Sequence, residues 1–177
     1  MAVDQALFDR LKQRFGSRVV RVELETRDPW VEVTAESLVE ICRFLRDEPA
    51  LRFDMLNCIS GVDFLHTDPK KAAKATWEPH LSIVYHLSST VTKQNCVVKV
   101  NVRRWKDDSE GRLPEVPSVC DVWLGANWHE REVFDLMGVQ FSGHPDLRRI
   151  LCPEDWAGHP LRKDYQMPAD YHGIPAR

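Results

Sequence analysis

Four charged residues within six positions, Glu130, Arg131, Glu132 and Asp135, form the part of the sequence whose side chains could do chemistry. Paired carboxylates can act as general acid and base when burial or crowding separates their pKa values. An arginine between them instead favours two-pronged carboxylate contacts, because its planar guanidinium matches them. Three interpretations stay open: catalysis, bracing within the chain, and bracing combined with a protein–protein interface.

Charge pairing fits this segment better than catalysis. Arg131 lies four positions before Asp135, the spacing of an ion pair on a helix surface. Arg148, Arg149 and Arg162 follow among further carboxylates, and such an alternation can fix the register of a protein–protein contact. We therefore expect Arg131 to lie between carboxylates, either of this chain or of a neighbour.

No complete metal or nucleotide motif accompanies these charges. HEREV resembles the HExxH zinc helix, but Val133 stands where that motif needs its second histidine. GVQFSGHP (138–145) resembles a phosphate-binding loop, yet His144 and Pro145 replace its lysine and hydroxyl residue. The chain also has no CxxC, GxGxxG or GxSxG motif. We predict no catalytic, cofactor-binding or metal-binding residue in this chain.

A helix from Trp128 to Met137 must position the charged residues. Asn127 followed by Glu130 predicts a capping box at its start, and Gly138 suits its end. The remaining elements follow from apolar periodicity and from turn residues. They are a helix whose apolar stripe runs from Val3 to Phe15, strands at 18–24 and 30–33, a helix between Thr34 and Pro49, a strand at 55–65, and a hairpin of strands 81–87 and 96–102.

This order of elements predicts an α+β fold: a mostly antiparallel or mixed sheet of about five strands with helices packed on it. Five of the eleven prolines fall in the last 33 residues, so an extended C-terminal tail is expected there. Scattered aromatic and aliphatic residues in that tail indicate that it lies on a surface. We place an α+β domain at 1–140 and an extended docking segment at 141–177.

The composition is that of a globular protein. Of 177 residues, 43% are hydrophobic and 29% charged, and the formal net charge of −3 argues against a nucleic-acid partner. The five cysteines, odd in number, indicate reduced and mostly buried thiols in a cytosol-like compartment. No apolar run approaches the roughly 18 residues that span a bilayer, so work at a membrane would depend on partners.

The stretch NWHEREVFDLMGVQFSGHPDLRRIL, followed by GHPLRKDY, resembles the 30-kDa subunit of proton-pumping NADH:quinone oxidoreductase, respiratory complex I. Weaker likeness extends the resemblance over about residues 53–171. The family signature and the partner interface it implies comprise Glu130, Arg131, Glu132, Asp135, His144, Arg148, Arg149, Trp156, His159, Arg162, Lys163 and Tyr165.

The resemblance implies a hydrophilic subunit of the peripheral arm with a structural role. Such a protein packs beside the 49-kDa-type subunit of the same arm and has no redox centre, while FMN and iron–sulfur clusters belong to partner subunits. It supports electron transfer from NADH to quinone in the assembled, proton-translocating complex. The start of the sequence has neither a signal peptide nor a transit peptide, which favours the cytoplasmic face of a bacterial inner membrane; the matrix side of the mitochondrial inner membrane is the alternative.

Two other functions are kept as alternatives. The first is the equivalent subunit of a related membrane redox complex, a membrane-bound hydrogenase or a chloroplast-type dehydrogenase. The second is a free-standing metal-dependent hydrolase that would use His129, Glu132, His144 or His159. The identity of the proteins that accompany this chain would distinguish the first alternative, and bound metal would indicate the second.

Overall fold

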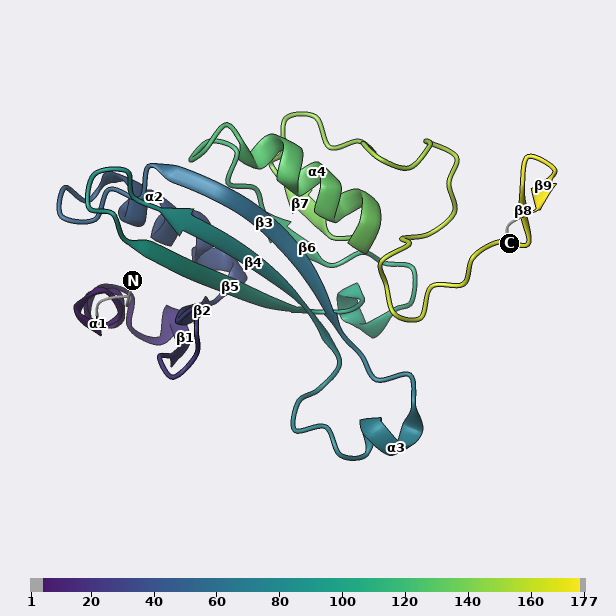
Figure 1. Ribbon diagram of the computed structural model, residues 1–177, viewed down its shortest axis with the longest axis horizontal. Helices are drawn as coiled ribbons and strands as arrows, with labels where there is room; N and C mark the ends of the chain where they lie inside the picture. The colour runs from purple at the N-terminus through teal and green to yellow at the C-terminus, as the bar shows by residue number, and fades with distance from the viewer. Residues whose placement is uncertain (1–4, 176–177) are drawn as a thin grey trace.

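A five-stranded mixed sheet forms the centre of the molecule in the computed structural model, which describes residues 5–175 (Figure 1). Its strand order is β1-β2-β5-β4-β3, with β2 and β5 parallel and all other neighbours antiparallel. The strands are β1 (Val19–Glu23), β2 (Trp30–Val33), β3 (Met55–Phe64), β4 (His80–Ser88) and β5 (Asn95–Arg103). The predicted α+β class and the predicted hairpin are confirmed.

Alternation along the hairpin builds the core face of the sheet. Ile83 lies opposite Val100 and Tyr85 opposite Val98, so apolar side chains of neighbouring strands meet on one face. All four are fully buried. Because side chains in a strand alternate between faces, this register commits every second residue of β4 and β5 to the core.

Three helices pack against this core: α1 (Gln5–Phe15), α2 (Leu38–Asp47) and α4 (Ala126–Met137). α1 and α2 meet where the rings of Phe15 and Phe44 pack edge to face with centroids 5.5 Å apart. Val3, which we expected at the start of the first helical stripe, lies outside the described residues. No helix in the described part of the chain is long and apolar enough to cross a bilayer.

Close contact between α4 and β3 depends on Gly61. A Cβ atom at this position would lie 2.7 Å from Cγ of Met137 and 3.3 Å from Cγ1 of Val133. Both of those side chains belong to α4 and are buried. The glycine in the middle of β3 therefore lets the helix that carries the charged residues lie directly on the sheet.

We expect Gly61→Val to lower the free energy of unfolding by about 1–3 kcal/mol, the usual cost of forcing extra carbon atoms into a packed core. Urea denaturation measures the change. Ser60→Val is the matched control, because Ser60 is exposed on the other face of the same strand and tolerates a β-branched residue. Equal stability of Gly61→Val and the wild type would show that α4 does not pack there as described.

A parallel pair of short strands flanks α4: β6 (Glu115–Pro117) and β7 (Gln140–Ser142). The chain passes from β6 through a turn into α4, and then reverses at Gly138 into β7. Gly138 has φ +67°, a conformation that favours glycine. This β–α–β unit brings the turn after β6 and the loop after β7 to the N-terminal end of α4.

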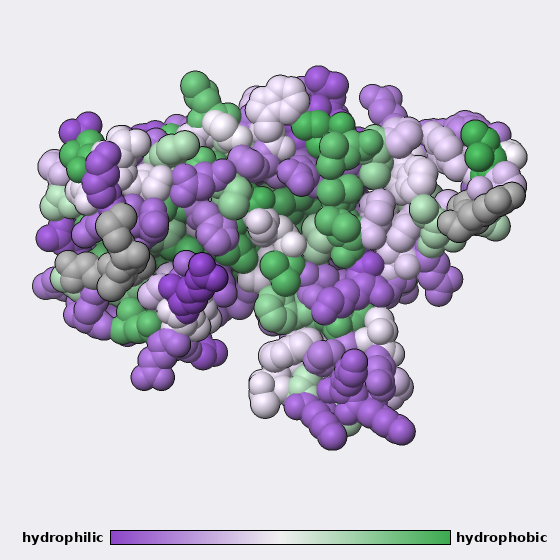
Figure 2. Space-filling model, viewed as in Figure 1, coloured by the Kyte–Doolittle hydropathy of each residue, from purple (hydrophilic) through white to green (hydrophobic). Residues whose placement is uncertain are grey.

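Two extensions leave the body of the molecule (Figure 1). The connection from β3 to β4 carries α3 (Pro69–Ala72), and its surface is hydrophilic at the tip (Figure 2). The C-terminal segment ends in a small hairpin of β8 (Asp170–Tyr171) and β9 (Ile174–Pro175). Residues 143–169 contain no helix or strand, as their prolines and glycines predict.

Candidate functional site

The charged residues of α4 mostly face inward. Glu130 and Asp135 have no exposed surface and Arg131 has 5%, while Glu132 is exposed. The predicted capping box is wrong: Gly125 precedes the helix without a side-chain cap, and the Glu130 carboxylate points to the turn after β6. Buried charges need partners, and these partners define the site.

Asp135 is surrounded by hydrogen-bond donors from the C-terminal segment. Its Oδ2 accepts the backbone N–H groups of Ile150 (3.0 Å), Leu151 (2.7 Å) and Cys152 (2.8 Å). Its Oδ1 accepts Nη1 of Arg149 at 2.6 Å. Burial by itself raises the pKa of this carboxyl, but the donors outweigh it and lower the pKa to about 2. Asp135 is therefore a buried carboxylate that organises the loop opposite it.

Arg149 extends this arrangement along the C-terminal segment. Its Nη2 donates to the carbonyls of Trp156 and Gly158, both at 2.9 Å. His159 Nδ1 lies 2.9 Å from the carbonyl oxygen of Asp135. Burial lowers the pKa of His159, so its neutral form donates this hydrogen bond. A single charge pair thus closes a loop of about ten residues onto α4.

Arg131 binds carbonyl groups instead of carboxylates. Its Nε and Nη2 donate to the backbone oxygens of Arg148 (3.2 Å) and Arg149 (3.3 Å), and its guanidinium lies 5.2 Å from the ring centroid of Trp128. The prediction that Arg131 lies between carboxylates is wrong within this chain, and so is the predicted surface pair with Asp135. Residue spacing correctly placed both on one helix, but the loop that covers the helix supplies the actual partners.

Arg162 anchors the segment further along. It is 6% exposed and donates to the carbonyls of Met137 (2.9 Å), Gly138 (3.2 Å) and Arg104 (2.9 Å). Its guanidinium lies 3.7 Å from the ring centroid of Trp105. Arg162 therefore joins the C-terminal end of α4 to the residues that follow β5.

A second arginine continues the network. Arg104 makes a two-pronged contact with buried Asp63, both bonds at 2.9 Å, and also pairs with Asp164 at 2.7 Å. The backbone N–H of Lys163 donates to Asp63 at 3.0 Å. We expected the segment after Gly143 to stay mobile until a partner binds it. In the structure, its own body holds it as far as Asp164, because buried charges on both sides need each other.

The other predicted residues lie nearer the surface. Glu132 and Lys163 are exposed, and exposed Arg148 pairs with Asp146. Trp156 packs on Tyr171 with ring centroids 5.1 Å apart. Among the described residues, four buried side-chain polar atoms have no partner, and three belong to the C-terminal segment: Trp156 Nε1, Arg162 Nη1 and Tyr165 Oη.

Glu130 forms a separate cluster at the other end of α4. Its carboxylate accepts the Ser118 hydroxyl (2.6 Å), the Val119 N–H (2.7 Å) and the Cys120 thiol (3.4 Å). Burial raises the pKa of Glu130 more than these donors lower it. His144 approaches from the loop after β7, with Nε2 3.1 Å from the Asn127 carbonyl. Sequence reasoning missed Cys120 here, as it missed Asp63 and Arg104 in the network above.

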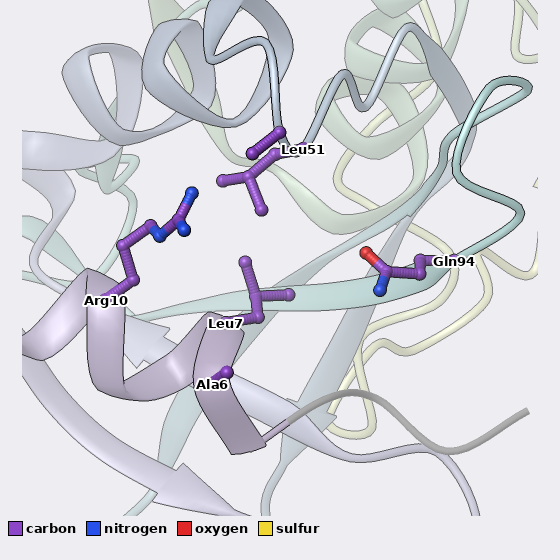
Figure 3. A pocket seen from close by; sticks show the side chains of 6 residues that line it. Ala6, Leu7, Arg10, Leu51 and Gln94 are labelled. Carbon is purple, nitrogen blue, oxygen red and sulfur yellow. The ribbon is translucent and has the colours of Figure 1, made fainter.

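The residues considered for hydrolysis do not come together. Among the described residues, the one group of three potential metal ligands consists of Cys120, Glu130 and His144. His129, Glu132 and His159 are not part of it. Elsewhere, a hollow of about 90 Å³ lies between α1 and two turns, lined by Ala6, Leu7, Arg10, Ala50, Leu51 and Gln94 (Figure 3). It offers one guanidinium and one amide, without a nucleophile or a carboxylate.

Comparison with known proteins gives consistent matches. Residues 31–171 match the family described as "Respiratory-chain NADH dehydrogenase, 30 Kd subunit". An NADH-quinone oxidoreductase subunit of Chlorobium phaeobacteroides is 43% identical, over 97% of this chain and 95% of that protein. The NADH-quinone oxidoreductase subunit of the same name from Roseiflexus sp. (strain RS-1) is 41% identical, over 96% of this chain and 88% of the relative.

The fold also matches a solved structure. A chain in the structure of the membrane-bound sulfane sulfur reductase, an archaeal respiratory membrane complex, superposes with a TM-score of 0.69 at 23% identity. The match covers 93% of this chain and 86% of the other. At this identity the likeness concerns the fold.

Proposed function

Because the chain belongs to the family of the 30-kDa subunit of respiratory-chain NADH dehydrogenase, we propose that it is a non-catalytic subunit in the peripheral arm of the complex. The family match over residues 31–171 carries this proposal. In this role the chain packs beside the 49-kDa-type subunit, on the cytoplasmic face of the membrane. It supports electron transfer from NADH to quinone through positioning, and FMN and iron–sulfur clusters reside in other subunits.

The use of the buried charges supports a structural role. Catalytic carboxylates and cations need free lone pairs or protons aimed at a substrate. Asp135 has four donors around it, and Arg149 and Arg162 spend their donors on backbone carbonyls. These groups hold the C-terminal segment on α4, so they shape a surface rather than transform a substrate.

The surface that they shape is suited to a protein partner. Hydrophobic side chains gather over α4 (Figure 2), and Trp128 and Leu161 remain 63% and 58% exposed. A groove of about 170 Å³ between β3 and α4 is lined mostly by apolar residues and has Leu161 at its edge. Exposed apolar side chains beside a groove are typical of protein–protein contacts. We assign the contact with the 49-kDa-type subunit to this surface and to residues 165–175.

The main alternative is the equivalent subunit of a related membrane redox complex. The partners decide between the two, so the test is to tag this chain at its native expression level and identify what accompanies it. We expect a constant ratio to a 49-kDa-type subunit and to the subunits that oxidise NADH. A hydrogenase large subunit in their place would establish the alternative, and a chain purified without partners would contradict both.

A substitution at the proposed contact tests the surface itself. Leu161→Glu is expected to weaken capture of the 49-kDa-type subunit at least about tenfold, because it places a charge in an apolar contact. Val91→Glu is the matched control, since Val91 is 53% exposed at a turn away from α4. Both variants should unfold like the wild type. Equal capture by Leu161→Glu and Val91→Glu would show that this partner binds elsewhere.

A further inference from the structure

A thiol, a carboxylate and an imidazole converge at the N-terminal end of α4. One ligand atom from each of Cys120, Glu130 and His144 lies within 4.8 Å of the others. The three come from three different segments: the turn after β6, the helix α4, and the loop after β7. Such a convergence of unlike ligands is not produced by helical or strand periodicity.

The cluster has two acidic groups and no basic side chain paired with them. Cys120 is 8% exposed and Glu130 is fully buried. Among the residues that the structure describes, neither lies in an ion pair with lysine or arginine. Burial raises the pKa of the Cys120 thiol to about 11, and the Glu130 carboxylate raises it further. A divalent cation would supply the missing positive charge.

The distances suit a small tetrahedral ion. Zinc binds sulfur at about 2.3 Å and nitrogen or oxygen at about 2.0–2.2 Å, which separates its ligands by about 3.3–3.6 Å. Cys120 Sγ lies 3.4 Å from the Glu130 carboxylate. The longer separations, up to 4.8 Å, require a movement of His144 of about an ångström. His144 follows Gly143 in a loop without regular structure.

We propose that Cys120, Glu130 and His144 form a zinc-binding site, with a water molecule as the fourth ligand. Thiolate and imidazole together favour zinc over magnesium or calcium, which prefer oxygen ligands. Binding releases the thiol proton and any proton on Glu130. Each ring nitrogen of His144 has one hydrogen bond at present, to Asn127 or to Asp146. Zinc replaces one of these, and the other then orients the ring.

This site differs from the predicted absence of metal ligands because Cys120 has no motif around it. Its consequence is mechanical: the ion ties the turn after β6 and the loop after β7 to the first turns of α4. The loop after β7 leads into the segment that Asp135 and Arg149 hold. The site therefore does not depend on which partner the surface binds.

The test uses the full chain, kept reduced and freed of metal by a chelator. Zn²⁺ is titrated in competition with a chromophoric chelator, and Co²⁺ serves as the spectroscopic probe. We expect one equivalent of metal and a near-ultraviolet thiolate-to-cobalt absorption. Cys120→Ser should remove this absorption and weaken zinc binding at least about 100-fold, more than the loss of an outer-sphere contact does. His144→Gln should weaken zinc binding similarly.

Matched controls separate this site from adventitious binding. Cys58→Ser removes a half-buried thiol elsewhere, and His129→Gln removes a histidine from the same helix that lies outside the cluster. Both should bind zinc like the wild type. Binding well below one equivalent, or binding of equal affinity in Cys120→Ser, would overturn the proposal. Circular dichroism of the metal-free variants checks that each one is folded.

Discussion

Asp135→Asn is expected to lower the free energy of unfolding by about 3–5 kcal/mol, the cost of removing one partner of a buried ion pair. The substitution leaves Arg149 without its carboxylate and turns an amide N–H toward three backbone N–H groups. Urea denaturation measures the loss. Asp146→Asn is the matched control: Asp146 also pairs with an arginine, but its side chain is 54% exposed, so the expected change is under about 1 kcal/mol.

The same carboxylate predicts a dependence of stability on pH. The pKa of Asp135 is about 2 in the folded chain, below its ordinary value of 3.8. A lowered folded-state pKa stabilises the protein above the ordinary pKa, and this contribution is lost as the pH falls through the folded value. The wild type should therefore lose its advantage over Asp135→Asn between about pH 4 and pH 2. A difference that stays constant across this range would contradict the assignment.

Arg162→Met is expected to lower the free energy of unfolding by about 2–4 kcal/mol. Methionine keeps much of the side chain's length, but the buried carbonyls of Met137, Gly138 and Arg104 lose their donor, and an unsatisfied buried carbonyl costs about 1–3 kcal/mol. The loss of one desolvated charge offsets part of this cost. Thermal and urea unfolding both measure the result.

Arg103→Met is the control for this change. Arg103 precedes Arg104 in the chain, but its side chain is 71% exposed and its partner Asp108 is equally exposed. Its expected effect is within about 0.5 kcal/mol. If both arginine variants were equally stable, the segment around Arg162 would be a mobile tail, as its sequence alone suggests, and not part of the folded body.

Local patterns predicted the main elements of the fold. Alternation in β4 and β5 and the helical stripes of α2 and α4 placed these elements to within a few residues. The parallel contact between β2 and β5 was not predictable, because strand order depends on which hydrophobic faces meet in space. Strands β6 and β7 have three residues each, too few for a periodic signal.

The site was predicted in membership more than in arrangement. Asp135, Arg149 and Arg162 were singled out from the sequence, and the structure brings them onto α4. Their partners were not found, because backbone groups of a distant loop carry no signal in side-chain spacing. Asp63 and Arg104 were also missed. The one available hint was an aspartate within an otherwise apolar strand, which implies a buried cation nearby.

The path of the C-terminal segment has a consequence for biosynthesis. Lys163 donates to Asp63 across 100 positions, and Arg104 meets Asp164 across 60. Translation proceeds from the N-terminus at about 5–20 residues per second. The sheet and α4 therefore emerge while the groups that neutralise Asp63 and Asp135 are still unsynthesised or inside the ribosome. The nascent chain holds two uncompensated acidic side chains until its last residues are free, so folding is completed only at chain release. A transcript truncated before codon 162 would yield a product that cannot complete this step, which marks it for proteolysis before it competes with full-length chains for a place in the complex.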